Sequence, residues 1–267
     1  MNASVERAQF AWQPLTPRGV AAFANASVGR LLLVQFVVAL VAAGTVVWFL
    51  HRAWFPVVAK AISQLPPQGE LESGRLDWRG GSSASLAEGR CLAFAVDLDH
   101  TGAARSPAHV QVEFGRTDVK VISLLGRLHG AYPRSWTVAF SRTELGPWWG
   151  AWAPAILAVA GASVVAGLML SWAVLATAYC LPAWLVGFFA NRAVNLGGSW
   201  RLAGAALMPG ALVLCVAIFL YGWGTLDLVG LAVASAVHLV VGWVYLGVSP
   251  LCLPRLAATT LKENPFA

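Results

Sequence analysis

The chain has 267 residues, of which 58% are hydrophobic and only 11% are charged, and its formal net charge is +6. A soluble domain usually carries about 25% charged residues, so this composition excludes an ordinary soluble protein and indicates a membrane protein. The positive charge does not predict nucleic-acid binding, because Lys and Arg are spread along the chain rather than clustered. We therefore expect a lipid bilayer as a partner, and neither a nucleic acid nor a cofactor.

The first long apolar run covers residues 31–50. At about 1.5 Å per residue, a helix over this run is about 30 Å long, which matches the hydrocarbon core of a bilayer. No small-residue cleavage site follows it, so we predict a retained transmembrane helix over 30–54 rather than a signal peptide. A cytoplasmic segment over 1–29 precedes it. Gln35 within this helix is a candidate for a hydrogen bond to a neighbouring helix.

Residues 55–147 are the only sizeable polar stretch, and we predict that they form a β-rich extracytoplasmic domain. A helical stalk is expected up to Pro66, where two consecutive prolines end it. About five short segments with alternating apolar residues follow, separated by Gly, Ser and Asp. No helix-length pattern separates them, which favours a small antiparallel sheet or sandwich over βαβ units. The segments read ELESGRLDW, CLAFAVDLD, HVQVEFG, DVKVISLL and SWTVAFS.

The segment Asp97-Leu98-Asp99-His100-Thr101 ends one of these predicted strands. It resembles the first motif of haloacid-dehalogenase-type phosphatases, in which the first Asp would be the nucleophile and the second the acid. That resemblance implies a doubly wound parallel fold and further Mg²⁺-binding acids, and the later acids of this domain form no such pair. Asp97 and Asp99 are therefore an alternative catalytic pair, and our main prediction is that the chain has no catalytic residue.

A second alternative is a metal site made by Asp97, Asp99, His100 and His109, because both carboxylates would lie on one face of a strand. A Ca²⁺ site would need more oxygen ligands than this stretch holds. The main interpretation is a strand that ends in a turn, with Asp99 capping the turn and Gly102 taking a positive φ. It predicts no metal ligand.

The second apolar run has no charged residue from 145 to 191 and is long enough for one long span or for two. With four spans in all, Arg192 and Arg201 lie on the same cytoplasmic side as the N-terminus, which satisfies the positive-inside rule. We therefore predict a second transmembrane helix over 148–181 and a cytoplasmic interfacial segment over 182–200. The alternative for that segment is a second helix that runs long and tilts.

Two further transmembrane helices are predicted over 201–222 and 227–248, followed by a cytoplasmic tail over 249–267. The loop between the two helices holds no Lys or Arg, as expected of an outer loop. Pro209 and Gly210 are expected to break the third helix. These assignments leave the N- and C-termini on the same, cytoplasmic side.

His238 is an ionisable residue near the middle of the fourth predicted helix. No second His lies at its depth to share a haem, so we expect its ring to hydrogen-bond a neighbouring helix. Small residues also recur along the second and fourth helices, where they allow close approach of helices within the bundle or of another membrane subunit. These small residues are Ala158, Ala162, Ala166, Gly230, Ala234 and Gly242.

The predicted layout is a helix, an outer domain and a helical bundle, and three motifs accompany it. They are LPPQGELESGRL at the entry to the domain, VDLDHTG at a strand end, and SWRLAGAALMPGALVLCVAIFLY at the step into the third helix. Layout and motifs resemble an uncharacterised bacterial family of membrane proteins, a domain-of-unknown-function family whose bundle looks loosely like the Yip-type proteins of vesicle traffic. The resemblance implies this architecture and no activity.

Together these patterns predict an α-helical integral membrane protein of the bacterial inner membrane. It has four transmembrane helices and a small β-rich extracytoplasmic domain inserted between helices 1 and 2. The predicted function is that of a non-catalytic scaffold, assembly or regulatory subunit, which associates with other membrane proteins or with itself and presents the outer domain to a partner. The alternative is a membrane-anchored enzyme, or a metal- or ligand-binding protein, that uses Asp97 and Asp99.

Overall fold

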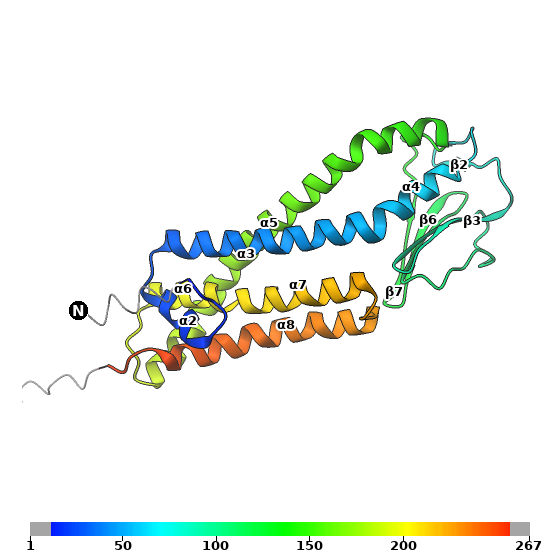
Figure 1. Cartoon of the computed structure of the whole chain (residues 1–267). Helices are drawn as coiled ribbons and strands as arrows, with labels where there is room; N and C mark the ends of the chain where they lie inside the picture. The colour runs from blue at the N-terminus through cyan, green and yellow to red at the C-terminus, as the bar shows by residue number, and fades with distance from the viewer. Residues whose placement is uncertain (1–11, 257–267) are drawn as a thin grey trace, which may run out of the picture. The chain divides into compact units, whose positions relative to one another are not determined.

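The computed structural model describes residues 12–256 of the chain, and it is mostly helical (Figure 1). Four helices are long and apolar enough to cross a membrane, and a small β-rich region lies between the first two in sequence. The prediction of four apolar helices with an inserted β-rich region is thereby confirmed. The residues form two compact units, which we describe one at a time. The four helices are Val28–Ser63, Arg142–Phe189, Leu196–Trp223 and Leu228–Cys252.

The first long helix continues without a break into the predicted stalk. Helix α3 (Val28–Phe49) passes through a π-helical turn (Leu50–Trp54) into α4 (Phe55–Ser63). Pro56 lies in the first turn of α4, where its missing N–H costs least, and the π turn directly precedes that helix. The predicted helical stalk is confirmed, and it ends before Pro66.

Helix α5 (Arg142–Phe189) is the longest element of the chain, with 48 residues. It continues through Pro182, so the region from 182 onward begins as part of a long second helix and not as a separate interfacial segment. Proline is tolerated within such apolar helices because neighbouring groups satisfy the carbonyl that it leaves free. A new helix, α6 (Leu196–Ala206), begins after Asn195, whose side chain caps it by accepting a hydrogen bond from the Gly198 N–H at 2.6 Å.

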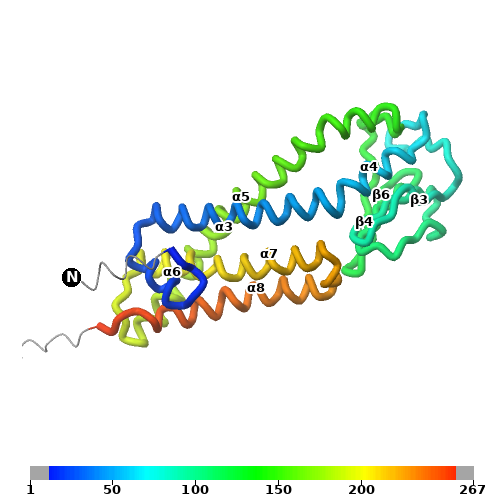
Figure 2. Tube along the Cα trace, in the orientation of Figure 1, coloured from blue at the N-terminus to red at the C-terminus, as the bar shows by residue number. Residues whose placement is uncertain are grey.

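The first unit has a core of tightly packed apolar side chains from both ends of the chain. Val20, Phe23, Leu31, Leu202 and Met208 are all fully buried there. Its other elements are α2 (Pro17–Ala22), the 3₁₀ turn Phe23–Asn25, α7 (Met208–Trp223), α8 (Leu228–Val248) and the 3₁₀ turn Ser249–Cys252. Residues 17–26 of the segment predicted as 1–29 are therefore a packed part of the fold, and its residues 1–11 lie outside the described part of the chain. The break predicted near Pro209 lies between α6 and α7 (Figure 2).

Two polar residues of the helices were predicted to bond to neighbouring helices. Gln35 does so: it is 3% exposed and its Nε2 donates to the carbonyl oxygen of Gly204 at 3.1 Å. His238 does not, because its Nδ1 hydrogen-bonds the Ser235 carbonyl one turn earlier in α8. The predicted partner on another helix is therefore wrong for His238, since the nearest acceptor is in its own helix.

The small residues predicted to pack helices divide into two groups. Gly242 is buried, and a methyl group there would touch Leu207 in ordinary van der Waals contact. Gly230 and Ala234 are half-buried on the same helix. The row on α5 differs, because none of its three alanines is buried by the described chain. These exposed residues are Ala158, Ala162 and Ala166.

The β-rich region holds two sheets with eight strands. A three-stranded sheet has the order β2-β1-β8, and a five-stranded sheet has the order β3-β4-β5-β6-β7. The strands of the smaller sheet are β1 (Glu70–Glu72), β2 (Arg75–Asp77) and β8 (Thr137–Ala139). Those of the larger sheet are β3 (Ser83–Glu88), β4 (Leu92–Asp97), β5 (Val110–Phe114), β6 (Asp118–Ser123) and β7 (Gly126–Ala131).

One strand pair departs from the predicted antiparallel sheet. Strands β4 and β5 are parallel, and every other neighbouring pair is antiparallel. Parallel neighbours need a crossover of about a dozen residues. The irregular segment 98–109 provides that crossover without a helix, which is why no helical pattern revealed it.

The larger sheet has one apolar and one polar face. On the apolar face, Val96, Phe114 and Val119 pack with Ala61 and Leu65 from α4 and its end. Since side chains alternate along a strand, their neighbours project from the opposite face. This polar face, on which the crossover 98–109 lies, carries the residues of the candidate site.

Candidate functional site

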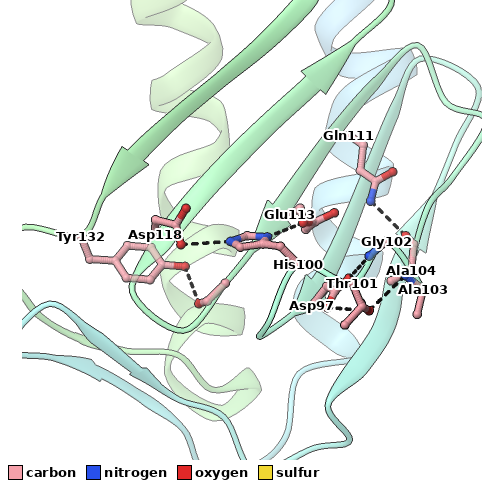
Figure 3. Close-up of polar contacts among 11 residues, drawn as sticks. Asp97, His100, Thr101, Gly102, Ala103, Ala104, Gln111, Glu113, Asp118 and Tyr132 are labelled. Carbon is pink, nitrogen blue, oxygen red and sulfur yellow. Dashed lines mark hydrogen bonds and ion pairs between the residues drawn. The ribbon is translucent and has the colours of Figure 1, made fainter.

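Asp97 ends β4 and organises the turn that follows it. Its side chain is buried, with 1% of the residue exposed. The carboxylate accepts hydrogen bonds from the Gly102 N–H at 2.7 Å and from the Thr101 hydroxyl at 3.1 Å (Figure 3). Gly102 has the predicted positive φ of 82°. The turn is thus capped by Asp97, and the prediction that Asp99 caps it is wrong.

The contacts of Asp97 keep its carboxyl group ionised. Burial alone would raise its pKa, but hydrogen bonds from Thr101 and Gly102 and the nearby His100 ring outweigh that effect and lower it. Both oxygens face donors of the chain's own turn. A carboxylate held in this way serves as a structural acceptor, because a nucleophile needs an oxygen that a substrate can reach.

Asp99 occupies a different environment from Asp97. It lies in the turn beyond the end of β4, is exposed, and forms a surface ion pair with Arg116 at 3.3 Å. The alternation expected of a strand stops at Asp97, so the two carboxylates do not share a face. The alternative catalytic pair is therefore not assembled by the fold.

His100 lies between two carboxylates that the sequence analysis did not connect with it. Its Nδ1 contacts Glu113 on β5, and its Nε2 lies 3.0 Å from Asp118 at the start of β6 (Figure 3). His100 has a positive φ of 53°, which directs the ring across the sheet. Gly115 makes this possible, because any side chain there would collide with the ring.

The two carboxylates change the protonation of His100. Burial lowers the pKa of the imidazole, and Lys120 also disfavours its charge, but the hydrogen bonds to Asp118 and Glu113 outweigh both effects and raise the pKa. Glu113 is 2% exposed, so a protonated His100 compensates a buried negative charge. The three residues tie the turn after β4 to β5 and β6.

His109 lies at the other end of the parallel strand pair. It directly precedes β5, and its backbone N–H donates to the carbonyl of Arg90 at 3.0 Å. Burial and the neighbouring Arg90 lower the pKa of its ring. The fold places His109 at the opposite end of the strand pair from Asp97, Asp99 and His100, so these four residues do not form the suggested metal site. Within residues 12–256, no group of three or more His, Cys, Asp or Glu could hold a metal ion.

A basic pocket of about 170 Å³ lies beside His100 on the polar face of the sheet. It gathers Arg105 from the crossover, Lys120 from β6, and Arg127 and His129 from β7. Register places Lys120 between Glu113 and His129 on the neighbouring strands. No hydrogen bond or ion pair joins the side chains of Arg105, Lys120 and Arg127 to another residue of the described chain. Glu113 also lines the pocket, but its carboxylate contacts His100, and the cations that remain favour a small anion.

This pocket was not predicted from the sequence. The sequence did hold a signal for it, in the basic residues on either side of a short turn. Lys120 precedes the turn, and Arg127 and His129 follow it at alternate positions. The contribution of Arg105 had no sequence signal, because the crossover brings it to the sheet.

Comparisons with known proteins add no relative to this description. No protein-family model matches the chain, and searches of curated proteins and of solved structures found no significant match.

The stability of the β-rich domain is expected to depend on pH through His100. Since its folded-state pKa is raised above about 6.5, its stabilising contribution is fully present below that pH and is lost as the pH rises through the raised value. In the full-length protein, pulse proteolysis should cut this domain less at about pH 6 than at about pH 8.5. The variant His100→Gln should abolish the difference. A variant with the same pH dependence as the wild type would contradict this role for His100.

Proposed function

We propose that this protein is a non-catalytic scaffold, assembly or regulatory subunit of the bacterial inner membrane. Its helices associate with other membrane proteins or with a second copy, and its β-rich domain lies on the extracytoplasmic side, where it presents a surface for binding. Both termini are cytoplasmic. The four apolar helices and the distribution of Lys and Arg between the loops support this placement.

The observation that carries the proposal is the unequal covering of the four helices. In the most apolar window of each, 44% of residues in the first and 56% in the third are buried, against 0% in the second and 6% in the fourth. Lipid can cover such faces, but the second helix also has a row of small residues. Ala158, Ala162 and Ala166 are four residues apart and exposed, so another helix could approach closely along them.

The alternative of an enzyme that uses Asp97 and Asp99 has less support from the geometry. Asp97 is engaged by Thr101 and Gly102, and Asp99 pairs with Arg116 at the surface. The two carboxylates therefore lack the shared environment that divides acid and base roles in a catalytic pair.

The proposal predicts that a bulky residue in the small-residue row will break a complex. In gently solubilised membranes, native mass spectrometry should show the wild type in an assembly larger than one chain. Ala162→Leu should release the monomer, because the added volume prevents close helix approach. Val174→Leu is the matched control, since Val174 is also on α5 and is 59% exposed, but it lies eight residues beyond Ala166, where the row of small residues has ended.

A photo-crosslinking residue at position 162 or 174 gives an independent measurement in intact membranes. Protein adducts should form at 162 and lipid adducts should dominate at 174, and the adduct mass distinguishes a second copy from another protein. A wild type that is strictly monomeric, with lipid adducts at both positions, would refute association through this face.

A further inference from the structure

The hairpin formed by β6 and β7 ends in two exposed leucines. Ser123 pairs with Gly126, so the loop consists of Leu124 and Leu125 alone. Two-residue hairpin loops usually contain Asn, Asp or Gly because those residues accept a positive φ, and neither leucine has one. Leu124 and Leu125 are 71% and 72% exposed, and Leu128 on β7 is 74% exposed. The fold gains nothing from this apolar tip, which indicates a contact outside the chain.

Strand register places the tip at one defined end of the sheet. Ser123 lies opposite Val110, and Val110 lies opposite Leu92 at the start of β4. Just before Leu92, the Arg90 guanidinium donates to the Leu226 carbonyl in the loop between α7 and α8. That loop joins two helices long and apolar enough to cross a membrane. The tip therefore lies at the end of the sheet that meets the loop between these two helices.

Basic residues lie immediately behind the apolar tip. Arg127 lies two residues after Leu125, and it lines the basic pocket together with Lys120 and Arg105. Ile122 and Leu128, which flank the tip, line the same pocket, so apolar and basic surfaces are continuous. Anionic lipid surfaces are bound by this combination of residues. Leucine side chains insert into the membrane interface, and neighbouring basic side chains attract the lipid phosphates.

We propose that the β6–β7 hairpin docks the domain on the bilayer, with Leu124 and Leu125 in the interface and an anionic lipid phosphate held by Arg127 and Lys120. This inference rests on the membrane location proposed above. A soluble phosphate would use the cations alone, and it would leave the adjoining leucines in water. A bilayer would contact both the leucine tip and the basic pocket, which lie together at this end of the sheet.

Hydrogen exchange of the full-length protein in lipid nanodiscs tests this contact. Amides of residues 123–129 should exchange at least about fivefold more slowly in discs that contain phosphatidylglycerol than in discs of phosphatidylcholine alone, the factor that one basic residue contributes near an anionic surface. Arg127→Gln should remove this lipid dependence. Arg134→Gln, which changes an exposed Arg of the same domain outside the pocket, should leave it intact. Leu125→Ser should speed exchange of the tip in both kinds of disc.

Two results would overturn the inference. One is equal exchange of residues 123–129 in both kinds of disc and in detergent. The other is full protection by glycerol phosphate in detergent, which would make the pocket a site for soluble anions. Peptides of α3 and α8 serve as an internal reference. If these peptides are unprotected in the discs, the proposed membrane location is wrong. If they are protected and the hairpin does not respond, only the docking of the hairpin fails.

Discussion

Replacing Asp97 with Asn is expected to destabilise the β-rich domain by about 1.5–3 kcal/mol, the usual worth of hydrogen bonds to a charged group. The carboxylate is buried and receives both the Thr101 hydroxyl and the Gly102 N–H. An amide in its place would keep the shape but lose the charge and part of the accepting capacity. Chemical unfolding of the full-length protein in detergent, followed by pulse proteolysis of this domain, measures the loss.

Asp99→Asn is the matched control for this experiment. Asp99 forms an exposed pair with Arg116, and such surface pairs contribute less than about 1 kcal/mol. If Asp97 were instead a phosphoryl acceptor, Asp97→Asn would abolish an activity and leave stability nearly unchanged. Equal, small effects of the two substitutions on unfolding would contradict the structural role of Asp97.

Gly210→Ala is expected to destabilise the helical unit by about 1–3 kcal/mol, the cost of forcing extra atoms into a close contact. Gly210 lies where α7 approaches α8, and a Cβ there would collide with the backbone carbonyl of His238. Because that oxygen belongs to the backbone, a side-chain rotation cannot relieve the collision, and the two helices must separate. Unfolding in mixed detergent micelles, followed by circular dichroism, measures the change.

Gly167→Ala is the control for Gly210→Ala, because it is also a Gly-to-Ala substitution within a long helix. Gly167 lies on α5, and a Cβ there meets nothing within 4 Å. Replacing Gly by Ala in a helix reduces the entropy lost on folding, so this variant should be as stable as the wild type or more stable by about 0.5–1 kcal/mol. Loss of stability of the same size in both variants would contradict the contact with the His238 carbonyl as the cause of the effect.

The helical part of the structure was largely predictable from the sequence. Each apolar helix is recognised from its own length and composition, because burial in lipid depends on the residues of one segment and not on distant partners. Gln35 was identified for a related reason: an amide in an apolar helix must find a partner, and it found the Gly204 carbonyl. The predicted boundary at residue 182 was less successful, since Pro182 does not interrupt α5.

The candidate site was much less predictable. Asp97, Asp99, His100 and His109 were predicted as one group because they are close in the chain. The fold places Asp97 in a buried turn, Asp99 at the surface and His109 at the opposite end of a strand pair. His100 instead meets Glu113 and Asp118, with which it forms the cluster of Figure 3. Their proximity depends on the parallel pairing of β4 and β5, which no local pattern encodes.

The sequence by itself therefore determined four apolar helices, a helical stalk, an inserted β-rich domain and a glycine with positive φ after Asp97. These features follow from hydropathy, from proline and glycine geometry, and from strand alternation, each of which acts over a few neighbouring residues. Only the tertiary structure decided the strand order, the ion pairs of His100, the basic pocket and the position of the leucine tip. Those features join residues far apart in the chain, and their proximity follows from the crossover and from the packing of the sheet on α4.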